Sequence, residues 1–274
     1  MPMTQGALEI SFLELSITAL FVIAAGGISL WGRLGLGKDL LIGSVRCVVQ
    51  LLAMGYVLKY IFNVASVWIV LLLFTIMVIF AVRIIRGNVA ETTIPFVMPA
   101  FLTMLMVYAL ISAIVTGLIV GAKPFWHPQY FIPLAGMVVG NSMTALGLSL
   151  DRLFSDLKTQ RDEVEMMLCL GATSIEASRD IFRKALKAGM IPSINSLAGV
   201  GLVFIPGMMT GQILSGEDPM LAIRYQIVVM FMLVASTALT VTIVLYIVRK
   251  RCFGPGQQLL LRPGSPIQSV NREK

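Results

Sequence analysis

Long apolar runs follow one another along the chain, from near its N-terminus almost to its C-terminus. At 1.5 Å per residue, each run is long enough for a helix to cross a hydrocarbon core of roughly 30 Å. The runs are continuous rather than alternating, which disfavours membrane β-strands, and a helix satisfies its own backbone hydrogen bonds in lipid. The pattern predicts an all-α integral membrane protein with about seven transmembrane helices. They are placed at residues 12–30, 40–61, 65–82, 95–120, 130–150, 189–211 and 225–248.

A polar stretch, residues 151–188, separates the fifth and sixth runs. Its apolar residues recur at helical spacing and trace one face: Leu153, Leu157, Val164 and Leu168. Gly171 and Ala172 interrupt this face. Thr173 then stands three residues before Glu176, the spacing of a capping box that starts a new helix. The stretch is predicted to be a bent pair of amphipathic helices outside the membrane.

The rest of the chain contains no large polar domain. Residues 1–250 are therefore predicted to form a single transmembrane domain that includes the 151–188 segment. Residues 251–274 are predicted to be a flexible cytoplasmic tail, because Gly and Pro recur there, as in Gly254-Pro255-Gly256.

Composition and charge fix the surroundings and the orientation. Hydrophobic residues make up 57% of the 274 positions and charged residues 13%, whereas a soluble domain carries roughly a quarter charged residues. The net charge of +7 could suggest nucleic acid as a partner. However, seventeen of the 21 Lys and Arg fall on one side if the N-terminus lies outside and the C-terminus inside. This positive-inside pattern predicts a multi-pass protein of the inner (cytoplasmic) membrane, surrounded by the lipid bilayer, with no nucleic acid.

The chain offers no catalytic set. Gly32 and Gly37-Lys38 have the spacing of a phosphate-binding loop, but Asp39 follows where that loop needs Ser or Thr to hold magnesium. The segment also follows a predicted membrane helix instead of the strand that this motif requires. The single histidine, His127, falls on an outer loop. We therefore expect neither an enzyme nor a bound cofactor.

Polar groups inside a membrane are expensive, so they are candidates for the translocation pathway. Arg46 is the costliest, at roughly 2.5–3.5 kcal/mol for a mid-bilayer arginine. Gln50 lies one turn further along the same face. Two interpretations stay open, a protein-facing Arg46–Gln50 pair and an Arg46 side chain that reaches the inner surface.

Small residues recur in the fifth run, at Gly136, Gly140 and Gly147. The spacing of Gly136 and Gly140 lets two helix backbones approach closely. That contact could be a dimer or pore interface, or ordinary packing within the chain. Asn141 and Ser142 follow the same face and could line the pathway or bond a neighbouring helix.

The sixth run carries the features of a broken helix. Pro206 removes a backbone donor, and broken helices of this kind flank transport sites. Asn195 is a further polar candidate in this run. Met208 and Met209 could offer thioether ligands, which suit Cu(I) better than iron, or they could fill the core. The residues alone therefore assign no metal site.

Glu165 stands six residues before Gly171, and Ile181 stands ten after it, as in the cytoplasmic loop of ABC importer permeases. Longer distinctive runs are 132–143, 170–173, 206–211, 218–226, and the segment from Arg46 and Gln50 to Phe62. In these runs the chain resembles FetB-type iron export permeases, over roughly residues 38–250. The resemblance implies a dimeric ABC-type permease that works with a separate ATP-binding subunit, where ATP hydrolysis takes place. Bacterial members are linked to iron efflux, and plant relatives to aluminium tolerance and UDP-glucose transport.

From this resemblance we expect a permease that exports iron or another metal ion. Its ATPase-coupling residues would be Glu165, Gly171, Ala172, Thr173 and Glu176. Two alternatives are an ATP-driven UDP-sugar exporter, in which Arg46 contacts phosphate, and a secondary carrier or channel that needs no ATPase. Iron prefers carboxylate and imidazole ligands, and the predicted spans offer only Glu14. The iron assignment therefore depends on the resemblance.

Overall fold

The computed structural model describes residues 11–261, except 33–34, 36, 65 and 92. Over these residues the chain is helical, with only two isolated β-bridges. It divides into two compact units. The N-terminal unit comprises Met1–Ser66 and Gly207–Ala222, and the bundle unit comprises Val67–Pro206 and Ile223–Lys274.

The N-terminal unit contains a helical hairpin and a short helix. Helix α1 (Phe12–Trp31) begins with a capping box between Ser11 and Glu14, and it packs against α2 (Gly37–Val64). Helix α9 (Gly207–Leu214) lies in the same unit. Most side chains of α2 are exposed and apolar, which suits a helix with lipid or another protein around it.

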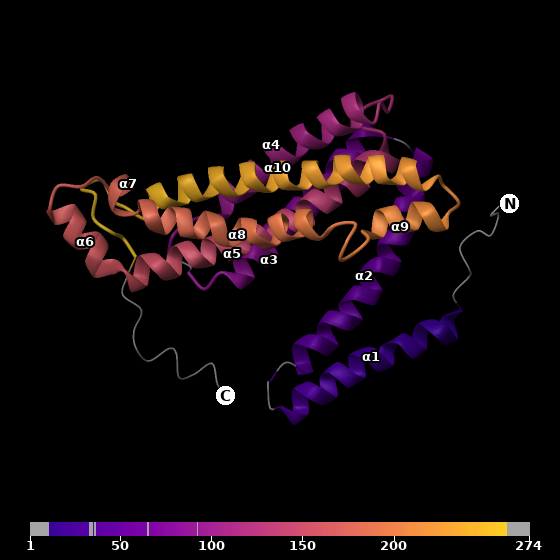
Figure 1. Cartoon of the computed structure of the whole chain (residues 1–274), viewed down its shortest axis with the longest axis horizontal. Helices are drawn as coiled ribbons and strands as arrows, with labels where there is room; N and C mark the ends of the chain where they lie inside the picture. Colours follow the sequence, from indigo (N-terminus) through magenta and orange to yellow (C-terminus); the bar gives the residue numbers. More distant parts are fainter. Residues whose placement is uncertain (1–10, 33–34, 36, 65, 92, 262–274) are drawn as a thin grey trace. The chain divides into compact units, whose positions relative to one another are not determined.

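The bundle unit is built around a long helix, α5 (Pro128–Thr159), which packs against α3 (Val67–Asn88), α4 (Val97–Ile114) and α8 (Arg179–Gly199). Phe74 of α3 meets Phe131 of α5 edge to face, with ring centroids 5.8 Å apart. The other elements of this unit are the π-helical turn η1 (Val115–Ile119), α6 (Arg161–Cys169), α7 (Ser174–Ala177) and α10 (Pro219–Arg251) from Ile223 onward. Helix α10 extends alongside α8 (Figure 1).

Five helices of the described chain are long and apolar enough to cross a membrane: α2, α3, α4 with η1, α5 and α10. They coincide with five of the seven predicted spans. The first predicted span corresponds to α1, in which the apolar segment Ile17–Trp31 is shorter. The count of seven and the orientation stay predictions.

The sixth predicted span, residues 189–211, is not one helix. Helix α8 ends at Gly199, residues 200–206 are not helical and include a turn at 201–203, and α9 begins at Gly207. Gly201 has a φ of +83°, in the left-handed region, and Pro206 cannot donate a helical hydrogen bond. Gly201 and Pro206 therefore keep residues 200–206 out of a helix, whereas the sequence predicted one membrane span that is broken near Pro206.

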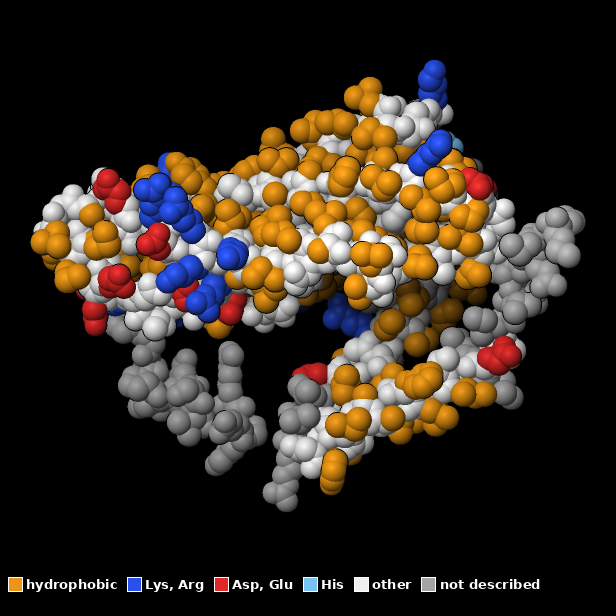
Figure 2. Space-filling view, viewed as in Figure 1, with side chains coloured by type: hydrophobic (Ala, Val, Ile, Leu, Met, Phe, Trp, Pro, Cys, Tyr) orange, Lys and Arg blue, Asp and Glu red, His pale blue; other side chains and the backbone are white. Residues whose placement is uncertain are grey.

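The polar stretch 151–188 also differs in its boundaries from the predicted helix pair. Helix α5 continues without a break from the fifth span to Thr159, and α8 starts as early as Arg179. Only α6 and the one-turn α7 are separate elements. Figure 2 shows charged side chains gathered at the end of the bundle unit that carries α6 and α7, and apolar side chains along its middle.

Candidate functional site

The segment between α6 and α7 is a rigid turn with defined caps at both ends. The amide of Ala172 donates to the carbonyl of Met167, and that of Gly171 to Leu168, both at 3.0 Å. This pair of hydrogen bonds ends a helix when the residue after the C-cap adopts a left-handed conformation. Gly171 does so, with a φ of +92°. We call residues Leu170–Thr173 the coupling turn.

The predicted capping box after the coupling turn is confirmed. The Thr173 hydroxyl accepts from the Glu176 amide at 3.3 Å, and the Glu176 carboxylate accepts from the Thr173 amide at 2.8 Å. The hydrogen bonds that the Glu176 carboxylate accepts from the Thr173 amide and from the Thr173 hydroxyl lower the pKa of this exposed carboxyl. The helix that starts here is only α7, because Ser178 separates it from α8.

The C-terminal residues up to Leu261 bond to α6 and α7, the two helices that flank the coupling turn. Arg161 at the start of α6 binds Glu165 at 2.6 Å, and its second nitrogen donates to the Leu261 carbonyl at 2.9 Å. On the other side, the Ser174 amide donates to the Gln257 side chain at 2.5 Å. Leu261 is 1% exposed, so this segment is packed. The predicted flexible tail therefore does not start at residue 251; residues 262–274 lie outside the described part.

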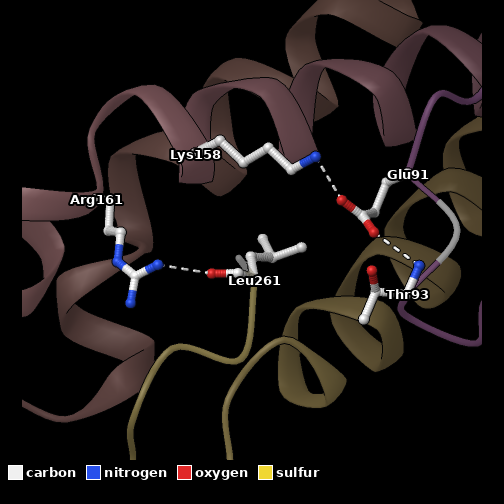
Figure 3. Close-up of polar contacts among 5 residues, drawn as sticks. All are labelled: Glu91, Thr93, Lys158, Arg161 and Leu261. Atoms are coloured by element: carbon white, nitrogen blue, oxygen red, sulfur yellow. Dashed lines mark hydrogen bonds and ion pairs between the residues drawn. The ribbon is translucent and has the colours of Figure 1, made fainter. Parts of the chain in front are cut away.

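A charged pair, Lys158 and Glu91, lies next to the start of α6, where α5 ends. Lys158, near the end of α5, binds Glu91 at 2.5 Å, and Glu91 also accepts from the Thr93 amide at 2.7 Å (Figure 3). Burial alone would raise the pKa of Glu91, but hydrogen bonds from Lys158 and Thr93 and the Lys158 charge hold it below the usual glutamate range. The bond between Lys158 and Glu91 fixes the α3–α4 loop to the end of α5. Burial and the Glu91 charge raise the pKa of the nearby Cys252 thiol to about 12.

The outer surface of α6 and the coupling turn is partly apolar. Leu170 is 81% exposed, Met166 57% and Ile175 46%, beside exposed carboxylates such as Glu163. A protruding apolar side chain at a rigid turn suits contact with another protein.

A second polar region lies within the membrane part of the bundle unit. Asn141 of α5 donates to the Ser193 hydroxyl of α8 at 3.2 Å and to the Thr237 hydroxyl of α10 at 3.4 Å. The hydroxyls of Ser142 and Thr237 are 3.0 Å apart. We call Asn141, Ser142, Ser193 and Thr237 the membrane polar cluster. The structure thus brings two predicted pathway residues together with two that the sequence did not single out.

The other pathway candidates lie elsewhere. Arg46 and Gln50 are exposed on α2, and Asn195 is exposed on α8. Met208 and Met209 are half-buried on α9, directly after the break that ends at Pro206. Within the described residues, no three His, Cys, Asp or Glu side chains come together as a possible metal site.

The predicted packing glycines have different environments. A Cβ on Gly136 would meet the Met77 side chain of α3 at 3.1 Å, so Gly136 serves packing within the chain. A Cβ on Gly140 or Gly147 would meet no atom within 4 Å. The closest helix contact involves Gly189 of α8 instead, where a Cβ would lie 1.8 Å from the Ser149 hydroxyl oxygen.

Sequence reasoning missed Ser193, Thr237 and Gly189, and one signal could have found them. Each lies on a helix face with other buried residues, such as Ala185 and Val241, at spacings of four. A small or hydroxylated residue on an otherwise apolar buried face indicates close contact or a hydrogen bond across helices.

The chain matches the family described as "Uncharacterised protein family (UPF0014)" over residues 12–253. The UPF0014 membrane protein YjkA of Bacillus subtilis is 36% identical over 250 residues, which cover 90% of this chain and 98% of YjkA. The "Probable iron export permease protein FetB" of Escherichia coli is 35% identical over 249 residues, 90% of this chain and 94% of FetB.

A plant protein is similar to a comparable extent. The UPF0014 membrane protein STAR2 of Oryza sativa subsp. japonica is 37% identical over 227 residues, which cover 82% of this chain and 78% of STAR2. No solved structure matches the chain. The resemblance to FetB-type permeases is confirmed by these relatives, and the chain belongs to the UPF0014 family of membrane proteins.

Proposed function

We propose that this chain is the membrane-spanning permease of an ABC-type exporter and works with a separately encoded ATP-binding subunit. One observation carries the proposal: α5 and α8 each run unbroken between the α6–α7 region and the membrane polar cluster. From Asn141 to Thr159 the helix spans about 27 Å, and from Arg179 to Ser193 about 21 Å, at 1.5 Å per residue. The name of the relative, "Probable iron export permease protein FetB", supports the same function.

The geometry suits a mechanism of mechanical coupling. The partner binds the exposed surface around Leu170, and closure of its nucleotide-bound form displaces the coupling turn. The turn keeps its shape, because the caps at Gly171 and Thr173 and the bonds of Arg161 make it rigid. The displacement passes along α5 and α8 and changes their contact at Asn141 and Ser193, which alternates access to the pathway.

We further propose that the working form contains a second copy of the chain. Arg46 and Gln50 are exposed on α2, and an arginine facing lipid near mid-bilayer costs roughly 2.5–3.5 kcal/mol. A partner copy against this face of α2 would shield both side chains from lipid.

For the cargo we propose iron or another metal ion, on the strength of the FetB name. A UDP-sugar is the alternative if Arg46 contacts phosphate, because a guanidinium binds phosphate oxygens in pairs. A carrier without an ATPase is the third possibility.

The deciding experiment reconstitutes the purified chain in liposomes with and without its candidate ATP-binding subunit, and measures export of ⁵⁵Fe and of UDP-[¹⁴C]glucose. Our proposal expects export only with the subunit and ATP. Full export by the chain alone would refute it. Glu165→Lys, which breaks the bond to Arg161, should uncouple ATP hydrolysis from transport. Glu217→Lys makes the same charge change at an exposed residue outside the α6–α7 region and should leave the coupling intact.

A further inference from the structure

Helix α4 has an exposed face and a buried face, and the residues of each face follow one another at spacings of four. Its exposed face is apolar throughout, as the surface of a helix in lipid should be. It consists of Met98, Leu102, Met106, Leu110 and Ile114, and Leu118 of η1 continues it. The opposite face is buried and changes from apolar to polar along the helix. It consists of Ala100, Met104, Tyr108, Ser112 and Thr116, the last belonging to η1.

Two of the three polar members of the buried face, Ser112 and Thr116, have no hydrogen-bond partner for their hydroxyl oxygens. Tyr108, Ser112 and Thr116 are each 0% exposed. Serine and threonine in a helix can bond the carbonyl four residues earlier, as Ser44 and Thr75 do. Ser112 and Thr116 do not, although an unmet hydroxyl in an apolar region is costly.

The row of hydroxyls is continuous with the membrane polar cluster. The Tyr108 hydroxyl lies within hydrogen-bonding range of Ser142, a member of the cluster, and of Thr240 of α10. At its other end the row reaches η1, where the Val120 amide donates to the Val115 carbonyl and widens the helix by one residue. Such π-helical turns occur frequently at functional sites.

We infer that the face formed by Tyr108, Ser112 and Thr116 is one wall of the cargo pathway, between the membrane polar cluster and the loop after η1. Neutral hydroxyls donate to and accept from oxygen atoms, but they do not replace the anionic ligands of a bare multivalent cation. The wall therefore fits a cargo that keeps oxygen around it, such as a hydrated or oxygen-chelated metal ion. This inference rests on the proposed permease function and adds the route and the form of the cargo.

Cysteine accessibility tests the wall directly. Ser112→Cys is nearly isosteric, and Thr116→Cys replaces the hydroxyl by a thiol and removes one methyl group. Leu110→Cys and Ile114→Cys place a thiol at matched depth on the lipid-facing side. Each full-length variant, in membrane vesicles, is treated with the charged, membrane-impermeant thiol reagent MTSET, and the modified peptides are counted by mass spectrometry. Because the thiolate reacts, and it forms in water and not in lipid, we expect Ser112→Cys and Thr116→Cys to react at least about tenfold faster.

Equal, slow labelling at all four positions would overturn the inference, because the buried face of α4 would then be dry packing. Variants are compared only if they elute as one symmetric species in detergent. Thr116→Ser, which keeps the hydroxyl, should preserve ⁵⁵Fe export, whereas Thr116→Val, of the same shape, should reduce it severalfold. Export that does not need the ATP-binding subunit would refute the proposed function but would leave the labelling pattern unchanged. The proposed function and the pathway wall can therefore fail separately.

Discussion

The two polar regions of the bundle unit use different chemistry. The membrane polar cluster is made of neutral groups, an amide and three hydroxyls, at 3.0 to 3.4 Å. The region around α6 is held by charged side chains at 2.5 to 2.9 Å. Lys158 binds Glu91, and Arg161 binds Glu165 and the backbone carbonyl of Leu261. The charged pairs gather near α6, at the end of the bundle unit, whereas the membrane polar cluster contains only neutral groups.

This difference suggests a division of work. Short charge-assisted bonds are roughly twice as strong as neutral ones, so they suit a region that must stay rigid while a partner moves it. Long neutral bonds between membrane helices average only about 0.6 kcal/mol, so helices held by them can change their contact at little cost. The following predictions test this contrast, in order of decreasing effect.

The largest effect is expected at Gly189, which lies on α8 between the two regions. A Cβ there would be 1.8 Å from the Ser149 hydroxyl oxygen and 2.5 Å from the Ala145 carbonyl oxygen, a backbone atom that cannot turn away. Gly189→Val should force α5 and α8 apart and cost about 3 kcal/mol. Thermal unfolding in detergent measures the loss. Gly140→Val is the control, because a Cβ on this exposed residue meets no atom within 4 Å; equal stability of both variants would contradict the close contact.

The next effect tests the charged region. Lys158→Met removes the partner of Glu91, whose side chain is 6% exposed, and should cost about 2 kcal/mol because a charged hydrogen bond is lost. The measurement is the unfolding midpoint in a graded denaturant series. Adding Glu91→Gln to Lys158→Met should restore part of the loss, since no buried charge is then left unpaired. Additive losses in the double variant would show that the two side chains do not interact.

A smaller effect is expected in the membrane polar cluster. Asn141→Ala removes two neutral bonds and should cost about 1 kcal/mol, at roughly 0.6 kcal/mol for each bond. Asn195→Ala is the matched control, because Asn195 is exposed on α8. A loss for Asn141→Ala as large as that for Lys158→Met would remove the contrast between the regions.

The sequence predicted what depends on neighbours along the chain. The capping box of Thr173 and Glu176, five of the apolar helices and the special position of Gly171 all follow from spacing and residue type. Contacts between distant segments could not be found in this way, because periodicity shows which face of a helix is buried but not what covers it. Lys158 meets Glu91 across 67 positions, and Arg161 meets Leu261 across 100.

The boundaries of the helices were also beyond the sequence pattern. A change from apolar to polar residues near position 150 suggested that a span ends there, but α5 continues to Thr159. The helix continues across such a change because one of its faces stays buried. Leu153 and Leu157 lie on that face and pack inside the bundle unit. The same holds for α8, which enters the membrane part from its charged start at Arg179.

The smallest effect is the pH dependence of stability, which we expect from the charged region and not from the membrane polar cluster. The pKa of Glu91 is lower in the folded chain than in the unfolded one, so its contribution to stability is complete above the unfolded pKa. It should be lost as pH falls through the folded pKa, because protonated Glu91 no longer attracts Lys158. Unfolding midpoints between pH 7 and pH 3 should therefore decline for the native chain below the usual glutamate range, and less steeply for Glu91→Gln. Asn141→Ala should keep the native slope, since no member of the membrane polar cluster titrates there. A Glu91→Gln curve parallel to the native one would mean that the bonds from Lys158 and Thr93 contribute nothing to the stability of the folded chain.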